Sequence, residues 1–245
     1  MTELAYEAAV FDCDGLLLDT ARAWARGFDA AAARAGLRLG VREQAELVGS
    51  SVASGAGLIA GWAGAPERRE ELADAVREEL SAAIRACPPP VLPGVPALLR
   101  RLRGALPMGV ASNAPADVLA VMLAGSGLLE NFETVVSADR VVRPKPAPDV
   151  YLAACRELDA RPENVVALED SAAGALAAQA AGLAVVVVTA SGWPALAPLP
   201  WPARNRPVLY VTAMGDPAVG QFVRSDVPPA RSRPVPAPPP NGRGR

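Results

Sequence analysis

Short apolar runs recur along the chain, and most of them give way to a small polar or acidic residue. The runs are rich in valine and are bounded by turn or charged residues, a pattern that is typical of buried strands in a parallel sheet. The predicted strands are residues 8–11, 108–111, 134–136, 165–168 and 183–188. A weaker run at residues 207–214 predicts a last edge strand.

Helical patterns lie between several of these runs, at residues 94–103, 115–124, 147–158 and 171–181. Pro115 stands in the first turn of the second helix, and Asn113 is its predicted N-cap. Gly182 is the predicted C-cap of the fourth helix. The alternation of strand and helix predicts an α/β fold built on a doubly wound parallel sheet.

Residues 20–90 break this alternation. They show helical patterns at 22–35 and 66–86, separated by a loop rich in glycine, serine and alanine at 49–57, and no strand pattern. We therefore expect a helical insertion at 20–90, within a core formed by residues 1–19 and 91–225. Residues 226–245 are mostly proline and arginine, so we expect a disordered tail that buries too little apolar surface to order itself.

Composition narrows the function classes. The chain has 245 residues, about half of them apolar, and a formal net charge of −2, which favours neither nucleic acid nor an anionic membrane as a partner. The apolar runs are too short to span a bilayer, and the N-terminus lacks a secretory signal. The odd number of cysteines (Cys13, Cys87 and Cys155) predicts buried thiols in a reducing compartment, so we expect a cytoplasmic protein.

The basic residues carry two further signals. The chain has no histidine, which excludes a Ser-His-Asp triad, a Cys-His pair and a histidine metal site. Of its 24 lysine and arginine residues, only Lys145 is a lysine. Either this lysine survived by chance, or its position requires a compact ammonium that a planar guanidinium cannot replace.

Two aspartates follow the first predicted strand. Side chains alternate along a strand, so Asp12 and Asp14 point the same way and Cys13 points into the opposite packing. Two carboxylates on one side at a strand end are costly unless a cation or a proton relieves them, and ligands of parallel sheets bind beyond this end. The alternative is an acidic turn, with Asp19 or Thr20 capping the next helix.

Three more clusters lie at predicted strand ends or between prolines. Ser112 and Asn113 suit a phosphate before a helix, although both are also ordinary helix caps. Lys145 stands between two prolines, which fix the backbone that presents it. Glu169 and Asp170 offer hard oxygen ligands for magnesium, or simply begin a helix with favourable charge.

Taken together, the four clusters resemble the motifs of the haloacid dehalogenase superfamily. The segments are FDCDGLLLDT, VASN, RPKPAPDVY and LEDSAAG, in this order along residues 8–188. They most resemble the branch of phosphoglycolate phosphatases and beta-phosphoglucomutases. The resemblance implies a Rossmann-like core with an inserted α-helical cap. Pro144 departs from the pattern, because many relatives have glycine or another small residue before the lysine.

The resemblance also implies a mechanism. By position, Asp12 would attack phosphorus and form an aspartyl-phosphate, and Asp14 would act as general acid and then as general base. Ser112, the backbone N–H of Asn113 and Lys145 would hold the transferring oxygens.

A magnesium ion is part of the same implication. Asp12, Asp170 and the backbone carbonyl of Asp14 would hold it, and Glu169 would be either a further ligand or a partner of the ligands. Without Mg²⁺, three carboxylates would repel a phosphate dianion that Lys145 alone cannot neutralise. We therefore expect a magnesium-dependent phosphatase that hydrolyses a small phosphorylated metabolite.

Other functions stay open. A phosphomutase would carry a histidine soon after the first motif and basic residues in the cap loop, and both signals are missing here. A haloacid dehalogenase would not need Asp14, and a non-catalytic binding protein would not need the intact set of clusters. Arg22 and Arg26 either face the substrate or lie on a solvated helix surface. The identity of the substrate and the oligomeric state are not readable from the sequence.

Overall fold

The computed structural model describes residues 6–189 and 208–224. Its centre is a six-stranded sheet in the order β3-β2-β1-β4-β5-β6, and every neighbouring pair is parallel. The strands are β1 (Ala8–Phe11), β2 (Met108–Ser112), β3 (Thr134–Ser137), β4 (Val165–Glu169), β5 (Ala184–Val188) and β6 (Val208–Val211). The predicted α/β fold with a doubly wound parallel sheet is confirmed, including the edge strand β6.

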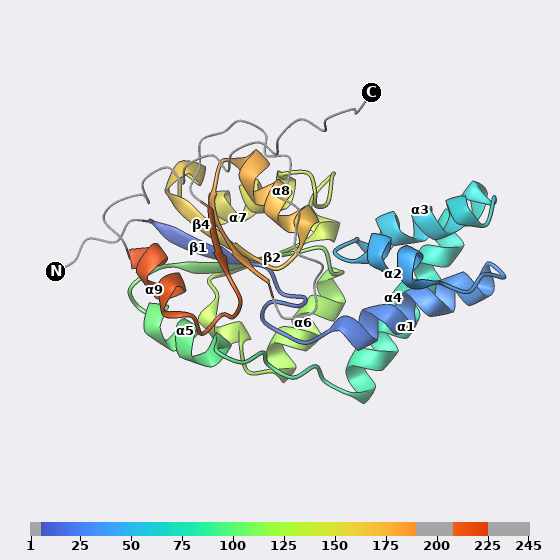
Figure 1. Ribbon diagram of the computed structural model, residues 1–245, viewed down its shortest axis with the longest axis horizontal. Coiled ribbons are helices and arrows are strands. Elements are labelled where there is room, and N and C mark those ends of the chain that lie inside the picture. The colour runs from blue at the N-terminus through green and yellow to red at the C-terminus, as the bar shows by residue number, and fades with distance from the viewer. Residues whose placement is uncertain (1–5, 190–207, 225–245) are drawn as a thin grey trace, which may run out of the picture.

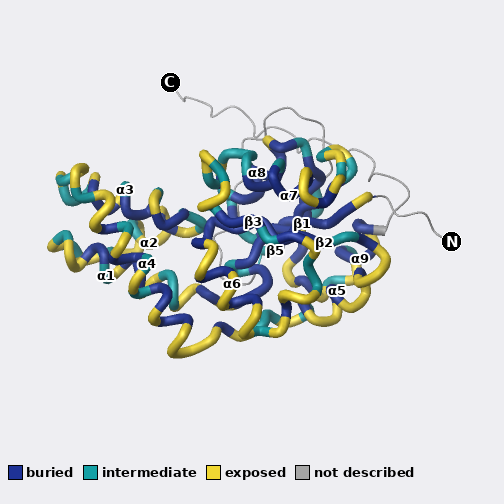
Figure 2. The backbone as a smooth tube through the Cα atoms, turned by 180° about the vertical axis from the view of Figure 1, so that it is seen from behind, coloured by how far each residue is buried: buried dark blue, intermediate teal, exposed yellow. Residues whose placement is uncertain are grey.

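Helices cover both faces of the sheet (Figure 1). On one face, α5 (Val95–Leu102), α6 (Ala116–Gly125) and α9 (Pro217–Arg224) share an apolar cluster with the sheet. On the other face, α7 (Asp149–Glu157) and α8 (Ala172–Ala181) form a second cluster, which is rich in alanine and valine. Figure 2 shows the central strands as buried, whereas the edge strand β6 is partly exposed. The buried strands form a rigid platform whose ends can hold side chains in fixed positions.

The segment between β1 and β2 is helical and stands to one side of the sheet (Figure 1). Apart from α5, which packs on the sheet, it consists of α1 (Ala21–Arg34), α2 (Val41–Leu47), α3 (Val52–Trp62), a short 3-10 turn (Pro66–Arg68) and α4 (Arg69–Ala86). These helices enclose an apolar cluster of their own. We call them the cap; the boundaries 20–90, 1–19 and 91–225 stay predictions, and the predicted tail at 226–245 lies outside the described residues.

The structure corrects three expectations. Part of the expected loop at 49–57 belongs to α3, which begins after Ser51, whose side chain accepts a hydrogen bond from the backbone N–H of Ser54. Its small residues hid the helix because they serve packing: a side chain at Gly55 would collide with the ring of Phe28. Helices α2 and α9 were also not predicted, and Cys87 is exposed whereas Cys13 and Cys155 are buried.

No helix among the described residues combines the length and the apolar character that crossing a membrane requires.

Candidate active site

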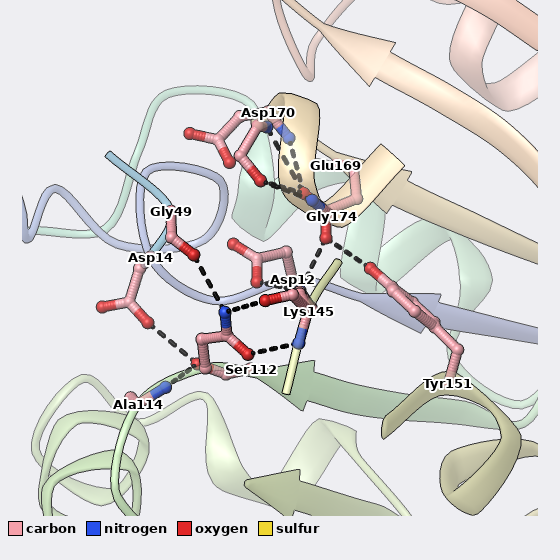
Figure 3. Close-up of polar contacts among 12 residues, drawn as sticks. Asp12, Asp14, Gly49, Ser112, Ala114, Lys145, Tyr151, Glu169, Asp170 and Gly174 are labelled. Atoms are coloured by element: carbon pink, nitrogen blue, oxygen red, sulfur yellow. Dashed lines mark hydrogen bonds and ion pairs between the residues drawn. The ribbon is translucent and has the colours of Figure 1, made fainter. Parts of the chain in front are cut away.

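The predicted site residues meet at the carboxyl ends of the strands (Figure 3). Asp12 and Asp14 follow β1, Ser112 is the last residue of β2, and Glu169 is the last residue of β4. Because β1 lies between β2 and β4 in the sheet, the ends of these three strands converge. Lys145 reaches the same place from the loop before α7.

Lys145 is the hub of the cluster. Its ammonium donates to Asp12 Oδ1 at 2.5 Å and to Glu169 Oε1 at 2.6 Å, and only 2% of its side chain is exposed. Burial alone would lower the pKa of Lys145, but the two carboxylates outweigh it and raise the pKa above its ordinary value. The lone lysine of the chain is therefore a permanent buried cation beside Asp12.

Glu169 is fully buried, and both of its carboxylate oxygens accept hydrogen bonds. Oε1 accepts from Lys145 and from the Tyr151 hydroxyl, and Oε2 accepts from Ser171 Oγ and from the backbone N–H groups of Asp170 and Ser171. A carboxylate offers about four lone-pair sites, so protein donors already occupy those of Glu169. Burial raises the pKa of Tyr151, which keeps its hydroxyl protonated as a donor.

Two glycines make room for the acidic groups. A Cβ atom at Gly174 would lie 1.8 Å from Glu169 Oε1, and a Cβ atom at Gly15 would lie 2.1 Å from Asp170 Oδ2. Gly15 also has a φ of +81°, a conformation that favours glycine. Both glycines belong to the motifs FDCDGLLLDT and LEDSAAG, so they are part of the architecture that places the carboxylates.

Asp12 shares the ammonium of Lys145 with Glu169, so together with Asp170 the cluster holds more negative than positive charge. Burial raises the pKa of Asp12 to about 8 and that of Asp170 well above its ordinary range, and for both the neighbouring carboxylates add to the rise. Asp170 Oδ1 is buried without a hydrogen-bond partner. Oxygens of Asp12, Glu169 and Asp170 lie within 4.8 Å of one another, so a hard divalent cation fits this position.

Asp14 is held between the core and the cap. Ser112 Oγ donates to Asp14 Oδ2 at 2.9 Å, and the indole N–H of Trp24, in α1 of the cap, donates to Asp14 Oδ1 at 2.7 Å. The Ser112 hydroxyl in turn accepts from the backbone N–H of Ala114. Both oxygens of this half-buried carboxyl are therefore occupied.

The sequence predicted Asn113 as the N-cap of α6, but the N-cap position is Pro115. The side chain of Asn113 instead accepts from the backbone N–H of Lys145 and donates to the backbone carbonyls of Lys145 and Gly49. It fixes the loop that presents the lysine and ties this loop to the cap.

A pocket of about 590 Å³ lies between the cap and the strand ends. Asp12, Asp14, Lys145 and Asp170 line its core side, whereas Trp24, Phe28, Leu47 and Val48 are among the residues on its cap side. Arg22 and Arg26 do not line it. Both are exposed, and Nε of Arg26 lies 3.7 Å from Oε1 of Glu79. Their reading as a solvated helix surface is the one that the structure supports.

Two site residues were missed by the sequence reasoning, Trp24 and Tyr151. Tyr151 is the last residue of the segment RPKPAPDVY, and it lay near the start of the helix predicted at 147–158. Trp24 carried no comparable signal, because a tryptophan in an amphipathic helix is more often part of the apolar packing.

Comparisons with known proteins agree with this geometry. The model of a family described as haloacid dehalogenase-like hydrolase matches residues 6–182. Hexitol phosphatase B of Escherichia coli (strain K12) is 33% identical over 189 residues, covering 75% of this chain and 83% of that protein. Fructose-1-phosphate phosphatase YqaB of the same organism is 29% identical over 187 residues, covering 75% of this chain and 96% of that protein.

Solved structures share the fold. CbbY from Rhodobacter sphaeroides, in complex with phosphate, has a TM-score of 0.71 at 27% identity, covering 86% of this chain and 96% of that chain. A beta-phosphoglucomutase from Clostridium difficile has a TM-score of 0.72 at 21% identity, covering 86% of this chain and 92% of that chain. The second likeness supports the fold alone.

Proposed function

Because the chain belongs to the haloacid dehalogenase-like hydrolase family, we propose that it is a magnesium-dependent phosphatase acting through an aspartyl-phosphate at Asp12. Its activity is that of a phosphatase of the sugar-phosphate type, in line with its named relatives. One observation carries the finer proposal: Asp12 lines the pocket, is hydrogen-bonded to the buried Lys145, and has an oxygen within 4.8 Å of a carboxylate oxygen of Asp170.

In the first step an oxygen of Asp12 attacks phosphorus. A bond forms between this oxygen and phosphorus, the bond from phosphorus to the ester oxygen breaks, and its electron pair stays on the leaving oxygen. Asp14, in its protonated form, gives that oxygen its proton, so the product leaves as a neutral alcohol. Lys145 and Ser112 would hold the oxygens of the transferring group, with the backbone N–H of Asn113.

In the second step water attacks phosphorus of the aspartyl-phosphate. Asp14, now a carboxylate, takes a proton from the water, and the bond between phosphorus and Asp12 breaks to release inorganic phosphate and the Asp12 carboxylate. Asp14 thus regains in the second step the proton that it gave up in the first, and it is ready for another cycle.

Mg²⁺ would be held by carboxylate oxygens of Asp12 and Asp170 and the backbone carbonyl of Asp14. When bound, it neutralises negative charge on the phosphoryl oxygens. We propose that Glu169 is not a direct ligand, because protein donors occupy its oxygens. Its part is to hold Lys145 and Tyr151 in place.

The pocket suits a phosphate ester with an uncharged remainder. Among the described residues that line it, Lys145 is the one cation, and its ammonium lies beside Asp12 and Glu169 at the phosphoryl end. A phosphomutase has to hold a second phosphate, and none of the described residues on the cap side of the pocket is a cation. We therefore propose a phosphorylated sugar or polyol as the substrate class, and hydrolysis in preference to transfer.

The test is phosphate release from a panel of metabolite phosphates, with wild-type protein and Asp12→Asn, in Mg²⁺ and in excess chelator. We expect turnover in Mg²⁺, none in chelator, and recovery when Mg²⁺ is added back. Asp12→Asn should lose at least about a thousandfold in kcat, as expected when a nucleophile is removed. The control is Asp29→Asn, an exposed carboxylate of the same chain.

Retention of a tenth of the wild-type rate in Asp12→Asn would rule out Asp12 as the nucleophile. Full activity in rigorously metal-free buffer would rule out the metal.

A further inference from the structure

Trp24 joins the cap to the acidic centre through a single polar contact. It belongs to α1, its ring packs against that of Phe28 at 5.5 Å between centroids, and its indole N–H reaches Asp14 Oδ1 at 2.7 Å. Asp14 follows β1 of the core. The contact therefore links the helical segment to a carboxyl for which the proposed function requires proton transfer.

The two oxygens of Asp14 have different roles, because their hydrogen-bond partners differ in chemistry. An indole N–H donates and cannot accept, so Oδ1 must remain an acceptor as long as Trp24 is bonded to it. The Ser112 hydroxyl can both donate and accept, so Oδ2 can carry a proton without losing its partner. The acidic proton of Asp14 therefore belongs on Oδ2, the oxygen beside Ser112.

We propose that Trp24 is a positioning residue for proton transfer, which holds the carboxyl of Asp14 so that Oδ2 faces the leaving oxygen. The inference rests on the proposed phosphatase function and adds to it a residue of the cap. Without the indole N–H, only Ser112 would restrain the carboxyl, and rotation about its Cβ–Cγ bond would exchange the two oxygens. Misorientation of this kind lowers the rate of a step that needs an aligned donor.

The experiment compares two substrates that differ in their need for a general acid. A sugar or polyol phosphate expels an alkoxide, which needs a proton in the transition state, whereas p-nitrophenyl phosphate expels a stable phenolate that does not. The quantity is kcat/KM, which reports the first irreversible step and is insensitive to hydrolysis of the aspartyl-phosphate. Trp24→Phe keeps an aromatic ring in the wall and removes the N–H.

We expect Trp24→Phe to lower kcat/KM at least about tenfold for the sugar phosphate and less than about threefold for p-nitrophenyl phosphate. The matched control is Phe28→Leu, which alters the same wall but removes no hydrogen bond to Asp14; its losses should be equal for the two substrates. Equal losses for both substrates in Trp24→Phe, or no loss in either, would overturn the inference and leave the phosphatase function standing.

A spectroscopic measurement keeps the test independent of activity. The chain has four tryptophans, and one indole ¹⁵N–¹H signal of the wild-type protein should shift and lose protection from solvent exchange in Asp14→Ala. Indole signals that are identical in the two proteins would overturn the contact itself. Absence of turnover by the wild-type protein with every phosphate ester would instead refute the proposed function.

Discussion

The two walls of the pocket are built on different principles. The core wall carries charged groups at the strand ends and on the loop before α7, where Lys145 has 2% of its side chain exposed. The cap wall is largely apolar, and Val48 on it is half exposed. A wall of buried charges that hold one another in place suits chemistry common to all phosphate esters, whereas an apolar and more accessible wall suits selection among the groups attached to them.

The largest effect is expected at the centre of the core wall. Lys145→Arg keeps the positive charge but inserts a larger planar group between Asp12 and Glu169, where the ammonium makes contacts of 2.5 and 2.6 Å. We expect kcat to fall by about a hundredfold or more while the fold is retained, as judged by circular dichroism. Arg85→Lys, the reverse exchange on an exposed position of α4, should leave kcat unchanged.

An arginine at position 145 that supports normal turnover would mean that the site needs only a charge. The survival of a single lysine in the chain would then have no chemical reason.

The second effect concerns stability rather than rate. The folded-state pKa of Asp170 lies well above its ordinary value of 3.8, so the folded protein binds this proton more tightly than the unfolded chain does. Its contribution to stability is present below pH 3.8 and is lost as the pH rises toward the folded-state pKa. At neutral pH, Asp170 therefore destabilises the metal-free protein, because its buried carboxyl must either carry an unfavourable charge or take up a proton.

Asp170→Asn removes the ionisable group, so it should raise the unfolding midpoint of metal-free protein by a few degrees, about 1 kcal/mol. It should also abolish the stabilisation that Mg²⁺ gives the wild type, because a ligand is lost. The measurement is differential scanning calorimetry at pH 8, with and without Mg²⁺. Asp149→Asn, in an ion pair with Arg143 away from the pocket, serves as control and should not gain stability. A destabilised Asp170→Asn that still responds to Mg²⁺ would contradict the assignment of this carboxylate.

The smallest effect is expected on the cap wall. Val48→Lys places a cation in the pocket opposite Lys145, so KM for a sugar bisphosphate should fall about fivefold relative to the monophosphate, the size of an exposed ion pair. The matched control is Val41→Lys, which adds the same charge at an exposed position outside the pocket. If both variants change the KM ratio equally, the effect comes from net charge and the cap wall does not select.

The same contrast explains how much of the molecule could be predicted from its sequence. Strands β1 to β5 were predicted to within one residue at each end, because a buried parallel strand is marked by a continuous apolar run. The weaker run at 207–214 extended three residues beyond the end of β6 at Val211. Residues such as Asp12 and Glu169 then met in space because parallel strands end at the same edge. The four motifs that these residues belong to resembled the haloacid dehalogenase superfamily, and the match of the family model over residues 6–182 confirms that resemblance.

The cap offered weaker signals. Helix α3 is rich in glycine, alanine and serine, and its mean composition resembles a loop although its small residues pack against Phe28. The contact between Trp24 and Asp14 joins an inserted segment to the core, and no periodicity within α1 indicates which of its residues faces the strand ends. Asn113 was predicted as a helix N-cap because asparagine more often bonds to the backbone near it in the chain. Its tertiary contacts with Lys145 and Gly49 cannot be inferred from the sequence.

The most direct test of the account is to look for the covalent intermediate itself. Wild-type protein is mixed with a sugar phosphate and Mg²⁺, quenched in acid within milliseconds, digested and analysed by mass spectrometry. The account predicts one added phosphoryl group on the peptide that contains Asp12, located on that residue and absent from Asp12→Asn. A phosphoryl group on any other residue, or rapid turnover with no phosphorylated peptide at any quench time, would contradict it.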